Sequence, residues 1–102
     1  YFLTSADTGL PLCSTGPAFY CPTTEKSFTT TNTGNNGVNN TVAFNIANAE
    51  TLFDSGNTAF NNLGGIFSGA FDYGLPFFFG RNLYVAIENQ NTPGGVGPYW
   101  AY

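Results

Sequence analysis

The chain has 102 residues, of which only 8% are charged, and its net charge is −4. Its two basic side chains, Lys26 and Arg81, are too few to follow a phosphate backbone, so we expect no nucleic-acid partner. The absence of histidine excludes a Ser-His-Asp triad and a His/Cys zinc site within one chain, and we expect no cofactor. The longest apolar run, residues 75–79, is too short to span a membrane.

The length indicates a single domain over residues 1–102. Aromatic residues make up 18% of the chain and glycine occurs 13 times, a composition typical of a turn-rich β protein. Residues 1–3 are expected to form a short strand, and the segment from there to residue 26 is expected to be mostly loop.

A β-hairpin is the clearest element of the first half. Residues 27–33 are rich in β-branched side chains, and residues 34–37 contain the Asn-Gly pair that is typical of a tight turn. Residues 41–49 then alternate, and this pattern places on one face Val42, Phe44 and Ile46.

Shorter elements are expected in the second half. A helix is predicted at 48–53 with Asn48 as its N-cap, and a further helical turn is predicted near Ala59 and Phe60. The glycines that follow are expected to be flexible: Gly64, Gly65 and Gly69. One helical turn is predicted at 75–80, strands at 83–88 and 99–102, and a turn at 89–97.

Cys13 and Cys21 lie close enough in the sequence to close a short loop that Pro17 stiffens. We expect a disulfide here, because the scarcity of charge and the many Asn and Thr residues favour an extracellular protein. The alternative is a pair of free buried thiols in a cytosolic protein. Asn39 begins a triplet, Asn-Asn-Thr, that fits the glycosylation sequon, although such triplets arise often by chance in this composition.

The segment 71–88, followed by 94–102, resembles the C-terminal end of an uncharacterised family of bacterial secreted proteins, domain of unknown function 3443. The segments 10–22 and 47–60 are also similar to that family, so the likeness covers nearly all of the chain. It implies a bacterial extracellular or cell-surface protein. The most specific part of the likeness is the run Gly74, Leu75, Pro76, Phe77, Phe78, Phe79, Gly80 and Arg81.

This family is in turn remotely similar to the pepsin-like aspartic proteases. In a pepsin lobe, an Asp-Thr/Ser-Gly loop precedes a β-hairpin, an apolar-apolar-Gly motif with a short helix, and two further strands. Residues 72–81 would correspond to the glycine-helix segment, whereas a second register aligns 78–84 with a segment of the retropepsins. The resemblance implies a mainly β fold, a small antiparallel barrel or sandwich like a truncated protease lobe, with one or two short helices.

The same resemblance places the catalytic Asp-Ser-Gly loop just before Tyr1, so the chain is expected to be a processed C-terminal fragment that lacks this loop and the first strand. Two similar triplets lie inside the chain, at 7–9 and 54–56. No apolar strand precedes Asp7, and Asp54 follows the hairpin instead of preceding it. A turn or helix end is the favoured interpretation of both. The alternative is a homodimeric acid protease with Asp54 at its two-fold axis.

We therefore expect a non-enzymatic extracellular module that associates with copies of itself, through strand pairing and aromatic burial, into an oligomer or a fibre. The low charge leaves little repulsion between copies. The residues expected to make these contacts are Tyr1, Phe2, Leu3, Tyr99, Trp100 and Tyr102.

A carbohydrate-binding β module is a further alternative. Its stacking platforms would be Tyr73, Tyr84, Tyr99 and Trp100. Packing of these aromatic rings in the core competes with that interpretation.

Overall fold

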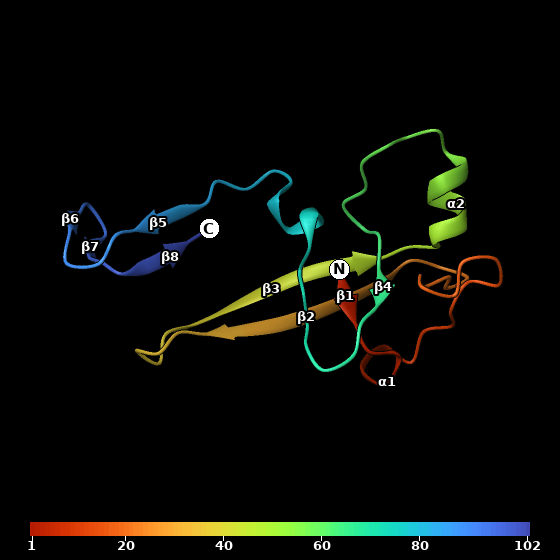
Figure 1. The fold of residues 1–102 in the computed structure, drawn as a ribbon, viewed down its shortest axis with the longest axis horizontal. Helices are drawn as coiled ribbons and strands as arrows, with labels where there is room; N and C mark the ends of the chain where they lie inside the picture. The colour runs from red at the N-terminus through yellow and green to blue at the C-terminus, as the bar shows by residue number, and fades with distance from the viewer.

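The computed structural model describes residues 1–102. Its longest element is an antiparallel hairpin of two eight-residue strands, β2 (Lys26–Thr33) and β3 (Asn39–Ile46) (Figure 1). Its register runs without a bulge from the Lys26–Ile46 pair to the Thr33–Asn39 pair. The turn between the strands includes Gly37 at a φ of 81°, a conformation that glycine adopts without steric cost. The predicted strand–turn–strand unit is confirmed.

One face of this hairpin supports the core. The three alternating apolar residues of β3 are buried, as the sequence pattern predicts: Val42, Phe44 and Ile46. The opposite face, which includes Thr29, Thr31 and Ala43, is exposed. The central cluster consists of Tyr1, Leu3, Tyr20, Phe44 and Ile46. Hydrophobic burial is therefore concentrated where the first residues and the disulfide loop cross the inner face of β3.

The opening strand β1 (Phe2–Leu3) is bonded on both sides within its own chain. It pairs in parallel with β4 (Gly65–Ile66). On its other side, Phe2 and Asp72 exchange two main-chain hydrogen bonds, with N–O distances of 2.7 and 2.9 Å. The expectation that residues 1–3 offer a free edge to another copy is therefore wrong.

Two glycines beside β1 are packed tightly, contrary to the expected flexibility. Gly64 and Gly65 are both buried. A Cβ atom at Gly65 would lie 2.9 Å from the Phe2 ring, and one at Gly64 would lie 2.9 Å from the Ile46 side chain. Glycine is needed at these positions because the backbone approaches its neighbours closely. The helical turn predicted near residues 59–60 is absent.

Three short helices occur. The sequence patterns predict α2 (Ala49–Asp54) and the 3₁₀ turn η1 (Leu75–Phe78), which carries a proline in its first turn. They do not predict α1 (Ser5–Thr8). Its signal is the cap residue Thr4, whose side chain accepts a hydrogen bond from the Asp7 N–H.

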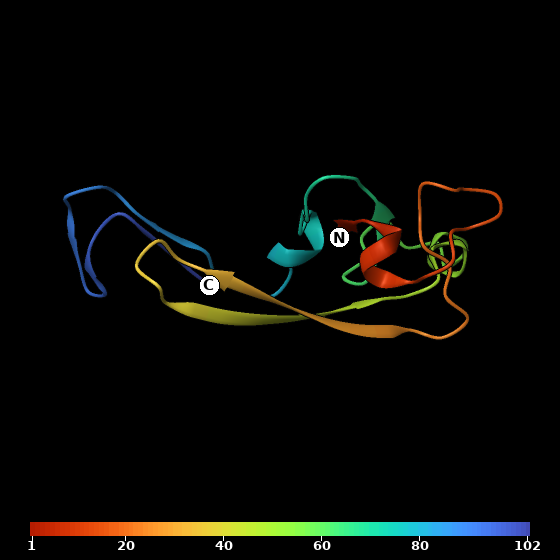
Figure 2. The same ribbon diagram turned by 90° about the horizontal axis from the view of Figure 1, so that it is seen from below.

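The last third of the chain forms a separate arm. Strand β5 (Tyr84–Ala86) pairs with β8 (Tyr99–Ala101), which confirms both predicted strands in shortened form. The predicted turn between them contains a small ladder of β6 (Asn91–Thr92) and β7 (Gly95–Val96). Figures 1 and 2 show that this arm extends beside the turn end of the β2–β3 hairpin, away from α1 and α2.

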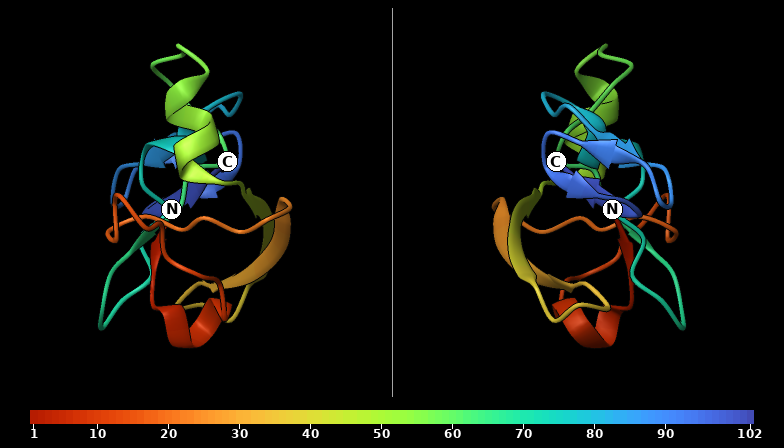
Figure 3. Two further views of the ribbon diagram at one scale, coloured as in Figure 1. Left: turned by 90° about the vertical axis from the view of Figure 1, so that its right-hand side faces the viewer. Right: turned by 90° about the vertical axis from the view of Figure 1, so that its left-hand side faces the viewer.

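The molecule is β-rich with short helices, but the expected barrel or sandwich does not form. It contains four sheets of two strands each, so no sheet has enough strands to close. The dimensions are 50 × 29 × 18 Å, and the radius of gyration is 16.3 Å, against about 13 Å for a compact chain of this length. Figure 3, along the long axis, shows the helices and arm on one side of the curved hairpin. None of the helices is long and apolar enough to span a membrane.

Candidate functional site

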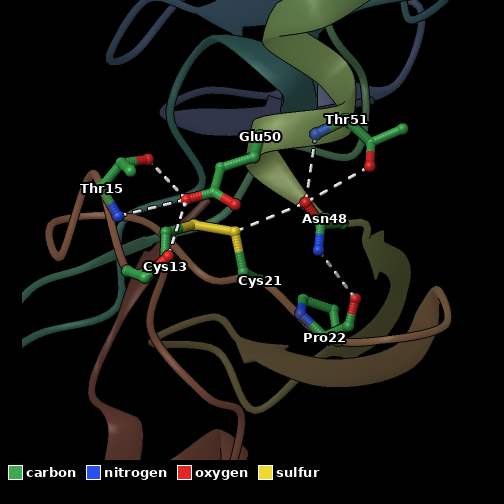
Figure 4. The surroundings of a disulfide bond; sticks show 8 residues. Cys13, Thr15, Cys21, Pro22, Asn48, Glu50 and Thr51 are labelled. Carbon is green, nitrogen blue, oxygen red and sulfur yellow. Dashed lines mark hydrogen bonds between the residues drawn. A yellow bond between two sulfur atoms is a disulfide. The ribbon is translucent and has the colours of Figure 1, made fainter.

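The predicted disulfide is present between Cys13 and Cys21, and a carboxylate holds the loop that it closes (Figure 4). Glu50, in the first turn of α2, accepts hydrogen bonds from the Thr15 hydroxyl at 2.5 Å and from the Thr15 N–H at 3.2 Å. The Ser14 hydroxyl lies at 3.5 Å from the same oxygen. These bonds lower the pKa of the Glu50 carboxyl, the Thr15 hydroxyl having the largest effect.

Asn48 joins the other end of this loop to the same helix. Its side-chain oxygen accepts a hydrogen bond from the Thr51 N–H at 3.1 Å, which confirms the predicted N-cap. Its amide donates to the Pro22 carbonyl at 3.3 Å (Figure 4). The disulfide loop and α2 are thus fastened together at two points, which gives this region a structural explanation.

The sulfur atoms of Cys13 and Cys21 and a carboxyl oxygen of Glu50 all lie within 4.8 Å of one another. Such a group could hold a metal ion only through thiolates, and both sulfurs are bonded to each other. Cys13 and Cys21 therefore act here as a covalent brace and not as metal ligands.

The most specific family segment, residues 74–81, is a scaffold for the arm. Gly74 precedes η1 with a φ of 59°, and the buried Phe77 ring lies against the Tyr73 and Tyr102 rings at centroid distances of 4.7 and 5.1 Å. The Arg81 guanidinium lies 4.6 Å from the centre of the same ring. Three further apolar side chains of the segment are exposed to different degrees, Leu75 at 66%, Phe78 at 50% and Phe79 at 39%.

The two Asp-Ser/Thr-Gly triplets are helix ends. Asp54 is the last residue of α2, Ser55 is its C-cap, and Gly56 has a φ of 76°. In the same way, α1 ends at Thr8 before Gly9 at a φ of 62°. Both triplets therefore end a helix, as the residue types predict. Asp54 is exposed.

The residues predicted to make assembly contacts lie in different environments. Tyr1 and Leu3 are core residues, 5% exposed, so they are unavailable for contact, and Phe2 is 37% exposed with its main chain paired. On β8, the Tyr99 hydroxyl shares a hydrogen bond with Thr92. Trp100 is 70% exposed.

The β2–β3 hairpin has the most prominent open edges. No main-chain N–H or C=O group of either strand bonds to any segment outside their mutual ladder. In an antiparallel pair, every second residue of each strand directs its N–H and C=O groups away from the partner. Two eight-residue edges with unpaired main-chain groups therefore border the same sheet. Sequence reasoning missed them as a site because it assigned the free edges to the terminal strands.

A groove of about 900 Å³ separates the turn end of the hairpin from β8. It is lined by residues from 32–40 and from 98–102, and none of these side chains is charged. The side-chain amide of Asn32, on the hairpin wall, donates a hydrogen bond to the hydroxyl of Tyr102, on the arm wall, at 2.6 Å. The same amide accepts a hydrogen bond from the Tyr73 hydroxyl at 2.7 Å. A defined contact between β2 and the end of the arm therefore joins the two walls of the groove.

The structure separates the four aromatic residues that were considered as carbohydrate platforms. Tyr73 packs against Phe71 and Phe77, and Tyr84 is exposed outside the groove. Only Tyr99 and Trp100 line the groove. Sequence reasoning missed the asparagines on the opposite wall. Their signal is the two Asn-Asn pairs, at 35–36 and 39–40, that flank Gly37 and Val38.

Comparison with known proteins identifies the family of this chain but no activity. A family model described as a protein of unknown function (DUF3443) matches residues 1–102. No curated protein and no solved structure matches the chain. The expected likeness to a protease lobe is therefore without structural support.

Proposed function

Because the chain belongs to the DUF3443 family of proteins of unknown function, we propose its function from its own geometry: it is a non-enzymatic module that assembles with copies of itself. The observation that carries this proposal is the pair of open edges on β2 and β3. The partner is a second copy of the chain, and the contact is strand pairing, which extends the hairpin into a larger sheet.

The edges lack the features that normally prevent such pairing. Proteins protect exposed edges with bulges, prolines or charges. The hairpin has no bulge, and between Ser27 and Thr33 there is no charge, proline or glycine. A β-branched, uncharged segment of this kind is the signature of strands that stack between chains. Lys26 is the one charged residue in either strand.

The exposed area supports a second copy as the occupant. The molecule has a solvent-accessible surface of 6781 Å². A compact protein of the same mass exposes about 5,600 Å². The excess, about 1,200 Å², is of the size that one or two protein interfaces remove from each partner. Only 14 of the 102 residues are buried, so association would supply the burial that the isolated chain lacks.

Two open edges on one hairpin favour a fibre over a closed dimer. When β2 of one copy pairs with either strand of the next, one edge of each hairpin stays open, and further copies can add. We place this assembly outside the cell, since the Cys13–Cys21 disulfide is of a kind that persists in an oxidising environment.

The test measures the assembly of the wild-type chain and of an edge variant by sedimentation velocity and electron microscopy. Thr29→Lys/Thr31→Lys places two charges on the exposed face of β2, whereas Thr23→Lys/Thr24→Lys adds the same charge at exposed positions before the strand. We expect the wild type and the control to sediment as large species or filaments, and the β2 variant to remain a folded monomer.

A folded, monodisperse monomer for the wild-type chain would overturn the proposal. Equal assembly by the wild type and the β2 variant would also overturn it, because the contact would then lie elsewhere. Circular dichroism of each variant establishes that the hairpin is intact.

A further inference from the structure

The groove between the hairpin turn and β8 combines the two chemical features that neutral sugars require. Its hairpin wall carries five asparagine side chains: Asn32, Asn35, Asn36, Asn39 and Asn40. Its other wall consists mainly of aromatic residues of the arm. Binding sites for small ligands typically enclose 300–1,000 Å³ with an apolar surface and a few polar groups, and this groove lies in that range.

Trp100 lines the groove on the side of β8, and its side chain is 70% exposed. No aromatic ring of the chain packs against it, and its indole N–H makes none of the side-chain hydrogen bonds of the chain. A large flat ring is thus presented to the groove without an internal partner.

Some asparagine amides of the hairpin wall form hydrogen bonds within the chain, and others form none. Asn32 bonds to two tyrosines, and the Asn36 oxygen accepts from the Val38 N–H at 3.2 Å. The side chains of Asn35 and Asn40 have no hydrogen-bond partner within the chain, and Asn40 lies on the inner face of β3 with Val42. Each amide offers two donors and one acceptor, which suits adjacent hydroxyl groups that both donate and accept.

The lining also excludes other ligand classes. Without a charged side chain, the groove cannot neutralise a phosphate, a sulfate or an acidic sugar. A purely apolar ligand would leave the free amides of Asn35 and Asn40 facing its surface without hydrogen bonds. A pyranose ring has one apolar face of C–H groups and a rim of hydroxyls, and it therefore matches an aromatic ring opposite amides.

We propose that this groove binds a neutral oligosaccharide. Trp100 stacks on the C–H face of one sugar ring, and Asn35 and Asn40 hydrogen-bond to its hydroxyls and to those of the next ring. The groove includes the turn-end residues of β2 and β3, so sugar binding is tested on a chain that does not assemble. A module with both properties would attach an extracellular assembly to a polysaccharide surface.

Trp100 is the only tryptophan in the chain, so its fluorescence reports directly on the groove. The experiment titrates the monomeric Thr29→Lys/Thr31→Lys variant with cellohexaose, chitohexaose and maltohexaose, and with hexagalacturonate as the acidic comparison. We expect a saturable change in emission with at least one neutral hexasaccharide and a much smaller change with the acidic one. If the variant assembles despite its charges, the wild-type chain at low concentration serves in its place.

Two further variants locate the site. Asn35→Ala/Asn40→Ala should weaken the neutral sugar roughly tenfold, while Asn57→Ala, an exposed asparagine outside the groove, should not. Trp100→Ala, measured by calorimetry, should abolish binding, while Tyr84→Ala retains it. The proposal is overturned if none of the neutral sugars changes the emission, if the acidic sugar binds as tightly, or if the groove variants bind like the controls.

Discussion

Glu50 and Thr15 are 35 residues apart in the sequence, yet their side chains meet at an oxygen–oxygen distance of 2.5 Å. The contact joins the first turn of α2 to the loop that the disulfide closes. The Thr15 hydroxyl and then the Thr15 N–H favour the charged carboxylate, which is why the pKa of Glu50 is lowered from 4.5. We therefore expect the contribution of this pair to stability to depend on pH.

We predict that Glu50→Gln loses stability at neutral pH and that this loss disappears in acid. The pKa of Glu50 is lower in the folded chain than in the unfolded chain, so its contribution is complete above the unfolded value of 4.5. The contribution of Glu50 to stability is lost as the pH falls through its lower pKa in the folded chain. The measurement is the urea midpoint of the wild type and the variant from neutral pH to below the folded pKa. A difference that does not change with pH would contradict this prediction.

Loss of the disulfide should destabilise the chain by about 2.5 kcal/mol, from the loop-closure entropy of its short loop. We expect Cys13→Ser/Cys21→Ser to show this difference in urea unfolding. Glu50 and Asn48 still hold the loop in the double variant, so it should fold. Reduction of the wild type should reproduce the effect, whereas the serine variant should not respond to reductant. The outcome against the prediction is a wild type whose thiols react freely with an alkylating agent before reduction.

Local sequence patterns predict the elements of this chain better than their arrangement. The β2–β3 hairpin, the Asn48 cap, the proline-led turn and the disulfide each depend on residues close together in the sequence, and each is present. The parallel pairing of residues 2–3 with residues 65–66 depends on packing between distant segments, and no local pattern encodes it.

The groove illustrates why a site can escape a linear pattern. The residue types indicate Trp100 as a possible sugar platform, whereas the asparagines of the hairpin turn are typical turn residues. They become one wall of a groove only because Tyr102 bonds to Asn32 and brings the arm beside the turn. Likewise, the barrel was expected from a resemblance to a protease lobe, and the structure has only two-stranded sheets.

Gly65→Ala should destabilise the chain by about 1–3 kcal/mol through overpacking. The added methyl carbon would lie 2.9 Å from the Phe2 ring and 3.0 Å from the Ala18 carbonyl oxygen, and the carbonyl belongs to a backbone that cannot easily move. Gly16→Ala is the matched control, because its nearest neighbour would be an ordinary contact at 3.8 Å. Thermal unfolding of both variants checks the difference. Equal midpoints would contradict the prediction, because the packing around β1 and β4 would then accommodate the added methyl group.

Tyr102→Phe should loosen the arm without affecting the hairpin. The variant keeps the ring that packs 5.1 Å from Phe77 and removes only the hydroxyl that accepts from Asn32. Loss of one such hydrogen bond is worth about 1 kcal/mol, so the amides of β5 and β8 should exchange with solvent roughly fivefold faster. The amides of β2 and β3 should be unchanged, because their ladder does not involve the arm. Tyr84→Phe, which removes an exposed hydroxyl without a partner, is the control. Hydrogen exchange followed by NMR makes the comparison, and equal acceleration in the hairpin and the arm would contradict the independence of these two units.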